Sequence, residues 1–171
     1  MKNNIRALVF HLFTVVFVFL LSLLIDANAT IRELVYSHLF FKLIVSFLII
    51  MFYYNLGKGM SKRRNRKFDY LTGIFIFLIA VFFGLIAFAG HGSEIFKIPV
   101  ASSMWRFPLD IFLLPEMYIL AIFKIKHNIL TFLISAILPG IIFGISIRHS
   151  RRRLAKQKRI RRQMENRRKR M

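Results

Sequence analysis

The residue types that hydrolases and metal sites use stand together at residues 90–94, in the order Gly-His-Gly-Ser-Glu. The spacing of His91, Ser93 and Glu94 matches neither a nucleophile elbow nor a zinc-binding helix motif. The two glycines favour a turn, which would keep His91 and Glu94 off a common helix face. The sequence also lacks a Gly-rich phosphate loop, a His-Glu-x-x-His motif and paired intramembrane aspartates. We therefore expect no enzyme activity, no metal site and no cofactor.

Three ionisable residues lie within or beside apolar stretches, namely Lys42, Asp110 and Glu116. A charge at the centre of a bilayer costs at least about 2.5 kcal/mol, so such residues need partners or a function. The favoured interpretation is an intramembrane ion pair of Lys42 with Glu116 or Asp110. The alternative is a site for a small molecule or ion, with Asp110 and Glu116 near a substrate path.

Small residues recur at four-residue intervals in the last apolar stretch, and a shorter pair occurs in the third. They are Ala136, Gly140 and Gly144, and Ala80 and Gly84. Such spacing lets two helices approach to backbone contact. It predicts packing of the third apolar stretch on the fourth, with self-association or docking on another membrane protein as the alternative. Pro139 should kink the last helix.

Residues 148–171 hold 13 Lys and Arg and one acid. Basic sequence beside a membrane span is attracted to anionic lipid by about 1 kcal/mol per residue. The residues expected to bind lipid are Arg151, Arg152, Arg153, Lys156, Lys158, Arg159, Arg161 and Arg162. A thin apolar stripe of Leu154, Ile160, Met164 and Met171 could lie in the interface. An acidic face of a protein partner and RNA or the ribosome remain alternatives, although the tail lacks aromatic residues that stack on bases.

These residues must be positioned by membrane-spanning helices, which need about 20 mostly apolar residues. Three segments qualify directly, at residues 7–25, 71–90 and 129–147. A fourth, at residues 39–56, qualifies if the Lys42 ammonium reaches the headgroups from its end.

A fifth apolar stretch, at residues 109–123, would be about 22 Å long as a helix and is too short to cross easily. Basic loops stay in the cytoplasm, and both residues 55–68 and residues 148–171 are strongly basic. The two segments share a side only if the fifth stretch does not cross. We therefore expect a short interfacial or re-entrant helix at residues 105–123 on the outer side.

On this topology the inner side carries 21 Lys and Arg against two acids, a net charge of +19, while the outer side has a net charge of +1. One alternative concerns the N-terminus, where Ala27-Asn28-Ala29 resembles a signal-peptide cleavage site. The preceding apolar run is longer than the usual 7 to 15 residues, which favours an uncleaved first span.

The composition of the 171 residues agrees, with 57% hydrophobic residues, 20 Phe, no Cys and a net charge of +20. It excludes an ordinary soluble enzyme, a disulfide-rich secreted protein, cysteine-dependent catalysis and a disordered polyelectrolyte.

The predicted fold class is an all-α integral membrane protein. Its membrane domain, residues 1–147, has four transmembrane helices and the short outer-side helix, and residues 148–171 form a basic cytoplasmic tail. We expect a multi-pass protein of a bacterial inner or cytoplasmic membrane with both termini in the cytoplasm. It would act by assembly with other membrane proteins or with itself, its tail bound to anionic lipid. A transporter or channel component and an RNA- or ribosome-recruiting protein are the alternatives.

Overall fold

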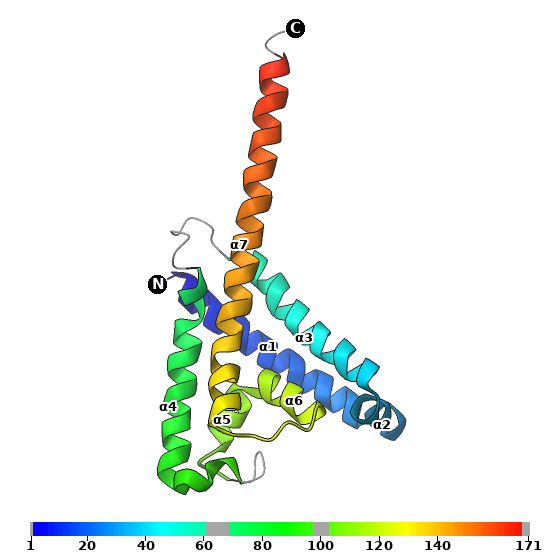
Figure 1. Cartoon of the computed structure of the whole chain (residues 1–171), viewed down its shortest axis with the longest axis vertical. Coiled ribbons are helices and arrows are strands. Elements are labelled where there is room, and N and C mark those ends of the chain that lie inside the picture. The colour runs from blue at the N-terminus through cyan, green and yellow to red at the C-terminus, as the bar shows by residue number, and fades with distance from the viewer. Residues whose placement is uncertain (1, 61–68, 98–102, 169–171) are drawn as a thin grey trace.

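A computed structural model describes residues 2–60, 69–97 and 103–168. Those residues fold into helices alone, without strands. Four of the helical segments are long and apolar enough to cross a membrane: Asn3–Asp26, Leu39–Lys58, Tyr70–His91 and Ile129–Asn166. The prediction of an all-α protein with four candidate spans is therefore confirmed (Figure 1).

The first half of the chain forms α1 (Lys2–Asp26), the short α2 (Ala29–Ser37) and α3 (Leu39–Lys58). The Asn28 side chain begins α2 by accepting hydrogen bonds from the backbone N–H groups of Thr30, at 2.9 Å, and Ile31, at 3.2 Å. This helix, which the sequence analysis did not predict, connects two antiparallel spans that pack against each other.

The second half begins with a 3₁₀ turn, η2 (Tyr70–Gly73), which continues into α4 (Ile74–His91). Gly92 ends α4 with a φ of 57°, a left-handed conformation that favours glycine, and leads into η3 (Gly92–Phe96). The last helix, α7, covers Ile129–Arg168. Asn128 caps it, because its Oδ1 accepts a 2.8 Å hydrogen bond from the backbone N–H of Thr131.

Residues 105–123 form two short helices where the sequence suggested one. These are α5 (Phe107–Phe112) and α6 (Leu114–Ile122), separated at Leu113. Proline stands in the first turn of both, because a ring without an N–H is tolerated there but interrupts a helix that tries to continue through it. The pair packs inside the bundle, with α5 on α1 and α4, and α6 on α1, α3 and α7 (Figure 1).

The surface of the four spans is apolar and their interior holds polar groups, the reverse of a water-soluble protein. Leu24, Phe47 and Leu85 are 71%, 63% and 63% exposed, whereas His11 and Thr14 are completely buried. Lipid tails would cover the exposed side chains, whereas the His11 ring bonds to neighbouring helices and the Thr14 hydroxyl donates to the Phe10 carbonyl of its own helix.

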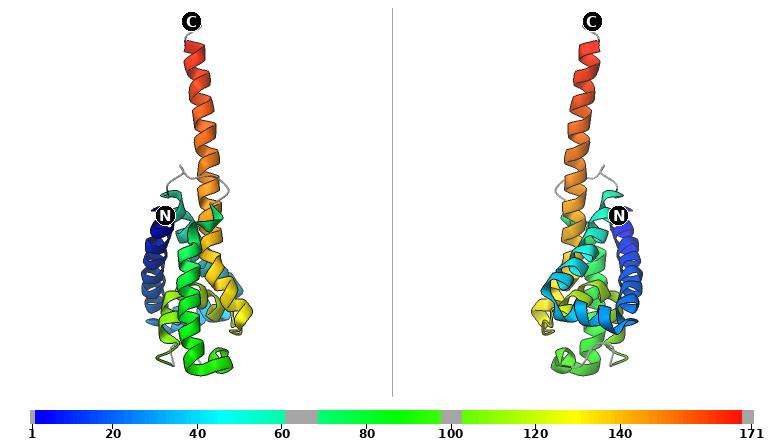
Figure 2. Two further views of the ribbon diagram at one scale, coloured as in Figure 1. Left: turned by 90° about the vertical axis from the view of Figure 1, so that its left-hand side faces the viewer. Right: turned by 90° about the vertical axis from the view of Figure 1, so that its right-hand side faces the viewer.

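The described residues on either side of 61–68 lie at the same end of the bundle as the start of the basic tail. Arg151 of α7 forms a 2.7 Å ion pair with Asp69, and the Ser146 hydroxyl donates a 2.6 Å hydrogen bond to the carbonyl of Tyr54 in α3. The N-terminus of α1 lies at this end too, and α2 and η3 lie at the other (Figure 1). Beyond the bundle α7 projects alone as a straight helix, while its first turns are inclined to the rest (Figure 2).

Candidate functional site

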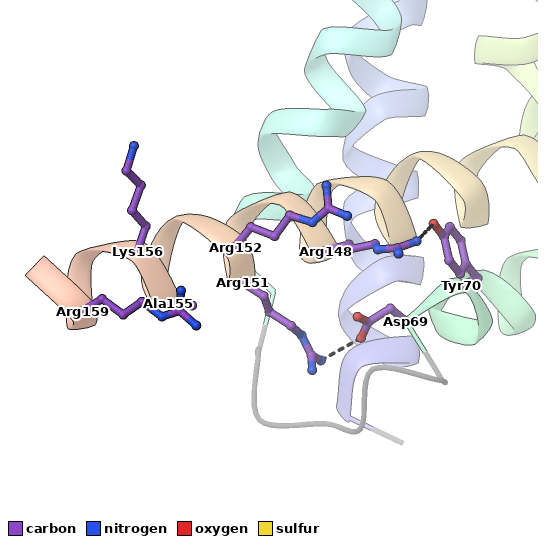
Figure 3. A pocket seen from close by; sticks show the side chains of 8 residues that line it. All are labelled: Asp69, Tyr70, Arg148, Arg151, Arg152, Ala155, Lys156 and Arg159. Carbon is purple, nitrogen blue, oxygen red and sulfur yellow. Dashed lines mark hydrogen bonds and ion pairs between the residues drawn. The ribbon is translucent and has the colours of Figure 1, made fainter.

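A cavity of about 580 Å³ opens where α7 leaves the bundle. Asp69 and Tyr70 form one wall, and the other is one face of α7, made of Arg148, Arg151, Arg152, Ala155, Lys156 and Arg159 (Figure 3). Steps of three and four residues keep these side chains on one side of the helix. The lining holds five cations and one acid, a net charge of +4.

Two polar contacts fix the cavity wall. Arg151 Nη2 lies 2.7 Å from Oδ1 of the buried Asp69, and Arg148 Nη1 donates a 3.2 Å hydrogen bond to the Tyr70 hydroxyl. The Nε of Arg151 is buried and has no hydrogen-bond acceptor in the part of the chain that the structure describes. A buried donor without an acceptor, beside other cations, is suited to an oxygen of an anionic ligand.

The remaining cations of the cavity are free to bind. Within the described ranges, Arg152, Lys156 and Arg159 make no hydrogen bond or ion pair with protein. Guanidinium and ammonium groups spaced along one helix face match the several oxygens of a phosphate ester. The lining of the cavity is therefore chemically suited to a phosphate-bearing anion.

The eight tail residues expected to bind lipid separate into two groups. Arg151, Arg152, Lys156 and Arg159 line the cavity. Arg153, Lys158, Arg161 and Arg162 lie on the projecting part of α7 and are exposed. Leu154, Ile160 and Met164 of the apolar stripe are exposed as well, and Met171 lies outside the described residues.

The small residues of the last span face η2 and α4. A Cβ on Gly73 would lie 2.3 Å from the Cα of Gly140, so the two backbones touch. A Cβ on Gly144 would lie 2.5 Å from the Tyr70 ring, and one on Gly84 would lie 2.9 Å from Phe132 of α7. Ala80 and Ala136 are buried. This surface of α7 is covered within the chain.

The three ionisable residues that the sequence singled out have separate surroundings. Asp110 Oδ1 lies 3.1 Å from Arg106 Nε, and Arg106 Nη1 also donates a 2.7 Å hydrogen bond to the carbonyl of Ile95, which ties α5 to η3. The Glu116 carboxyl is contacted by a tyrosine, Tyr53. Lys42 makes no ion pair with any residue that the structure describes.

A chain of three buried side chains joins α1, α3 and α6. His11 Nδ1 lies 2.6 Å from the Tyr53 hydroxyl, which lies 2.9 Å from Glu116 Oε1. The second ring nitrogen of His11, Nε2, lies 2.8 Å from the carbonyl oxygen of Phe112, at the end of α5. We call His11, Tyr53 and Glu116 the buried triad. Sequence reasoning missed His11 and Tyr53, although a histidine inside an apolar span is itself a signal of a polar partner.

No protein-family model, curated protein or solved structure matches this chain.

Proposed function

We propose that the protein is a multi-pass protein of the cell membrane, with both termini in the cytoplasm, that binds anionic lipid headgroups in the cavity at the base of α7. The single observation that carries the proposal is the cavity itself, with its five cations and one acid. The side of the membrane follows from charge, because the end of the bundle that bears this cavity adjoins both basic segments.

The height of the cavity supports a lipid ligand over a soluble one. Ile147 is the last completely buried apolar residue of α7, and Arg148 follows it directly. Arg148 and Arg152 are separated by about 6 Å along the helix, which fits a headgroup layer of roughly 5–8 Å. A phosphate at that level would meet Arg148, Arg151 and Arg152 without leaving the bilayer surface.

The proposal includes assembly with another membrane protein that carries an acidic surface. Beyond the cavity, α7 presents exposed cations whose one ion pair within the described residues is Arg161 with Glu165, at 3.5 Å. Two such helices would repel each other, so the charge favours an acidic partner over a second copy.

The experiment compares two triple variants of the full chain that remove the same charge. One is R148Q/R152Q/K156Q, at the cavity, and the other is K158Q/R161Q/R162Q, on the projecting part. Each is purified in mild detergent from a membrane supplied with phosphatidylglycerol, and the retained phospholipid is measured by native mass spectrometry.

We expect the cavity variant to lose at least about tenfold of its bound phosphatidylglycerol, while the projecting-part variant stays near the unaltered protein. Equal losses would mean that charge alone, rather than the cavity, attracts lipid. Copurification of RNA that disappears only in the projecting-part variant would favour an RNA-recruiting function instead.

A transporter or channel component is the second candidate, and one observation favours it. The interrupted helices α5 and α6 pack against α1, α3, α4 and α7, and discontinuous helices of this kind surround substrate sites in transporters. Uptake or efflux that is lost on substitution of Asp110 or Glu116 in reconstituted vesicles would decide for this function.

A further inference from the structure

The hydrogen bonds of the buried triad need one more hydrogen than neutral His11, Tyr53 and an ionised Glu116 carry together. The carbonyl of Phe112 only accepts, so the Nε2 of His11 that lies 2.8 Å away must carry a hydrogen. The Tyr53 hydroxyl has one hydrogen to give, yet it lies between His11 Nδ1 at 2.6 Å and Glu116 Oε1 at 2.9 Å. One of those two neighbours must therefore donate to Tyr53.

Two arrangements satisfy every contact. In the first, Tyr53 donates to a Glu116 carboxylate, and a doubly protonated His11 donates to Tyr53. In the second, a protonated Glu116 donates to Tyr53, which donates to a neutral His11. Both arrangements contain the same three protons, and they differ only in which end of the triad holds the mobile one.

The surroundings favour the neutral arrangement. His11, Tyr53 and Glu116 are 0%, 1% and 3% exposed, and separating a cation from an anion in such a place is costly. Burial raises the pKa of Glu116 to about 8. Its second oxygen, Oε2, has no hydrogen-bond partner among the described residues.

Among the described residues, no cation forms an ion pair with Glu116. His11 approaches from α1 and Tyr53 from α3, while α7 contributes the ring of Phe143, which packs edge-on against Tyr53. The acid on α5, Asp110, is paired with Arg106. Because no described cation pairs with Glu116, a bound proton is what neutralises its carboxyl group in this structure.

We propose that the buried triad is a proton-binding site, and that its bound proton holds α1, α3 and the break between α5 and α6 together. On release, the Glu116 O–H bond breaks, the proton passes to a solvent base, and the carboxylate accepts a hydrogen bond from the Tyr53 hydroxyl, which keeps its own hydrogen. His11 Nδ1 and the Tyr53 oxygen then face each other as two acceptors. The alternative histidine tautomer would leave the Phe112 carbonyl facing a ring nitrogen without hydrogen. Either way one contact between helices becomes repulsive.

The test uses dicyclohexylcarbodiimide, an apolar reagent that modifies protonated carboxyl groups in apolar surroundings. The intact protein in detergent is treated at a series of pH values, and modified residues are located by peptide mass spectrometry. We expect an adduct on Glu116 whose yield falls as pH rises through about 8. Asp110 serves as the internal control, because the Arg106 guanidinium occupies its carboxyl oxygen and should shield it from the reagent.

Two variants test whether the modification of Glu116 depends on its bound proton or only on its being buried. Glu116→Gln imitates the neutral arrangement, since its amide can donate to Tyr53 at every pH. Tyr53→Phe removes the hydroxyl that stabilises the carboxylate, so Glu116 should be modified up to a higher pH than in the unaltered protein.

The sign of the stability effect follows from the same proton. An unfolded glutamate has a pKa of 4.5, whereas folded Glu116 keeps its proton up to about pH 8. Between those values the folded state binds more protons, so its thermal midpoint should fall with rising pH relative to that of Glu116→Gln, and level off above.

Absence of a Glu116 adduct at every pH, a yield independent of pH, or parallel stability profiles for the two proteins would overturn the proposal. The result is independent of lipid retention, so a failure here leaves the cavity at the base of α7 untouched.

Discussion

Gly73 and Gly140 bring the backbones of η2 and α7 into contact, but the two positions differ in tolerance. A Cβ on Gly73 would lie 2.3 Å from the Cα of Gly140, whereas one on Gly140 would lie 3.4 Å from the Cα of Gly73. The first distance is a severe overlap and the second is an ordinary van der Waals contact. The contact is therefore sensitive to one of its two glycines.

We predict that Gly73→Ala destabilises the protein by about 1 to 3 kcal/mol through overpacking. Gly140→Ala, inside a helix, should be neutral or stabilising by up to about 1 kcal/mol, because alanine costs less backbone entropy. Unfolding of both variants in a detergent titration gives the comparison. Equal destabilisation by the two substitutions would show that the backbones do not meet at Gly73.

At the scale of single residues, the sequence identified the ionisable side chains in apolar stretches but not the residues that they contact. Glu116 stood out because a carboxyl group in an apolar stretch needs an explanation. Its contact, Tyr53, lies 63 positions away along the chain, and nothing local marks a tyrosine in a span as a donor. The Arg106–Asp110 pair is different, since its spacing of four residues was a readable signal.

At the scale of elements, α7 is one continuous helix through the end of the span. The sequence marked a change of composition at Arg148, and it left open whether the thin apolar stripe beyond that residue lies in the membrane interface. No Gly or Pro follows Gly144, so nothing in the sequence would turn the helix toward the bilayer. The structure accordingly has the helix leaving the bundle straight (Figure 2).

We predict that a nitroxide attached at Met164→Cys is relaxed by a water-soluble nickel complex and hardly by oxygen, because that part of α7 continues straight beyond the bundle and a straight continuation would carry it into water. Leu85→Cys, on the outer face of α4, should behave in the opposite way, since its side chain is 63% exposed on an apolar span. The absence of native cysteine makes both labels specific. Strong oxygen relaxation at Met164 would mean that the tail bends into the interface.

Helix lengths and hydropathy were sufficient to predict the four spans, because a bilayer crossing is specified by local composition. The interruption at Leu113 was not predicted, although Pro108 and Pro115 are visible in the sequence. Proline can either begin a helix or kink one, and only packing against α1 and α4 decides between these outcomes.

At the scale of the whole molecule, the proposed orientation depends on which elements lie at each end of the bundle. Gly59, at the end of α3, and the projecting part of α7 belong to the end of the bundle that adjoins both basic segments, whereas Glu94 lies in η3 at the other end (Figure 1). Basic residues stay in the cytoplasm, so η3 should face outward.

We predict that a membrane-impermeant maleimide modifies Glu94→Cys in intact cells, but modifies Gly59→Cys and Glu165→Cys only after permeabilisation. Each variant carries a single cysteine, so the readout is unambiguous. Modification of exactly one of Gly59→Cys and Glu165→Cys in intact cells would mean that α5 and α6 together cross the bilayer.

The straightness of α7 also has a mechanical consequence. From Gly144 to Arg168 the helix extends about 36 Å, so a tilt of about 10° within the membrane would displace its tip by about 6 Å. The helix would rotate as a rigid rod about its contact with η2, where α7 touches Gly73 and Tyr70. A small rotation of the span would therefore produce a larger displacement at the C-terminal end of α7, and a partner that moves this end would apply a torque to the bundle.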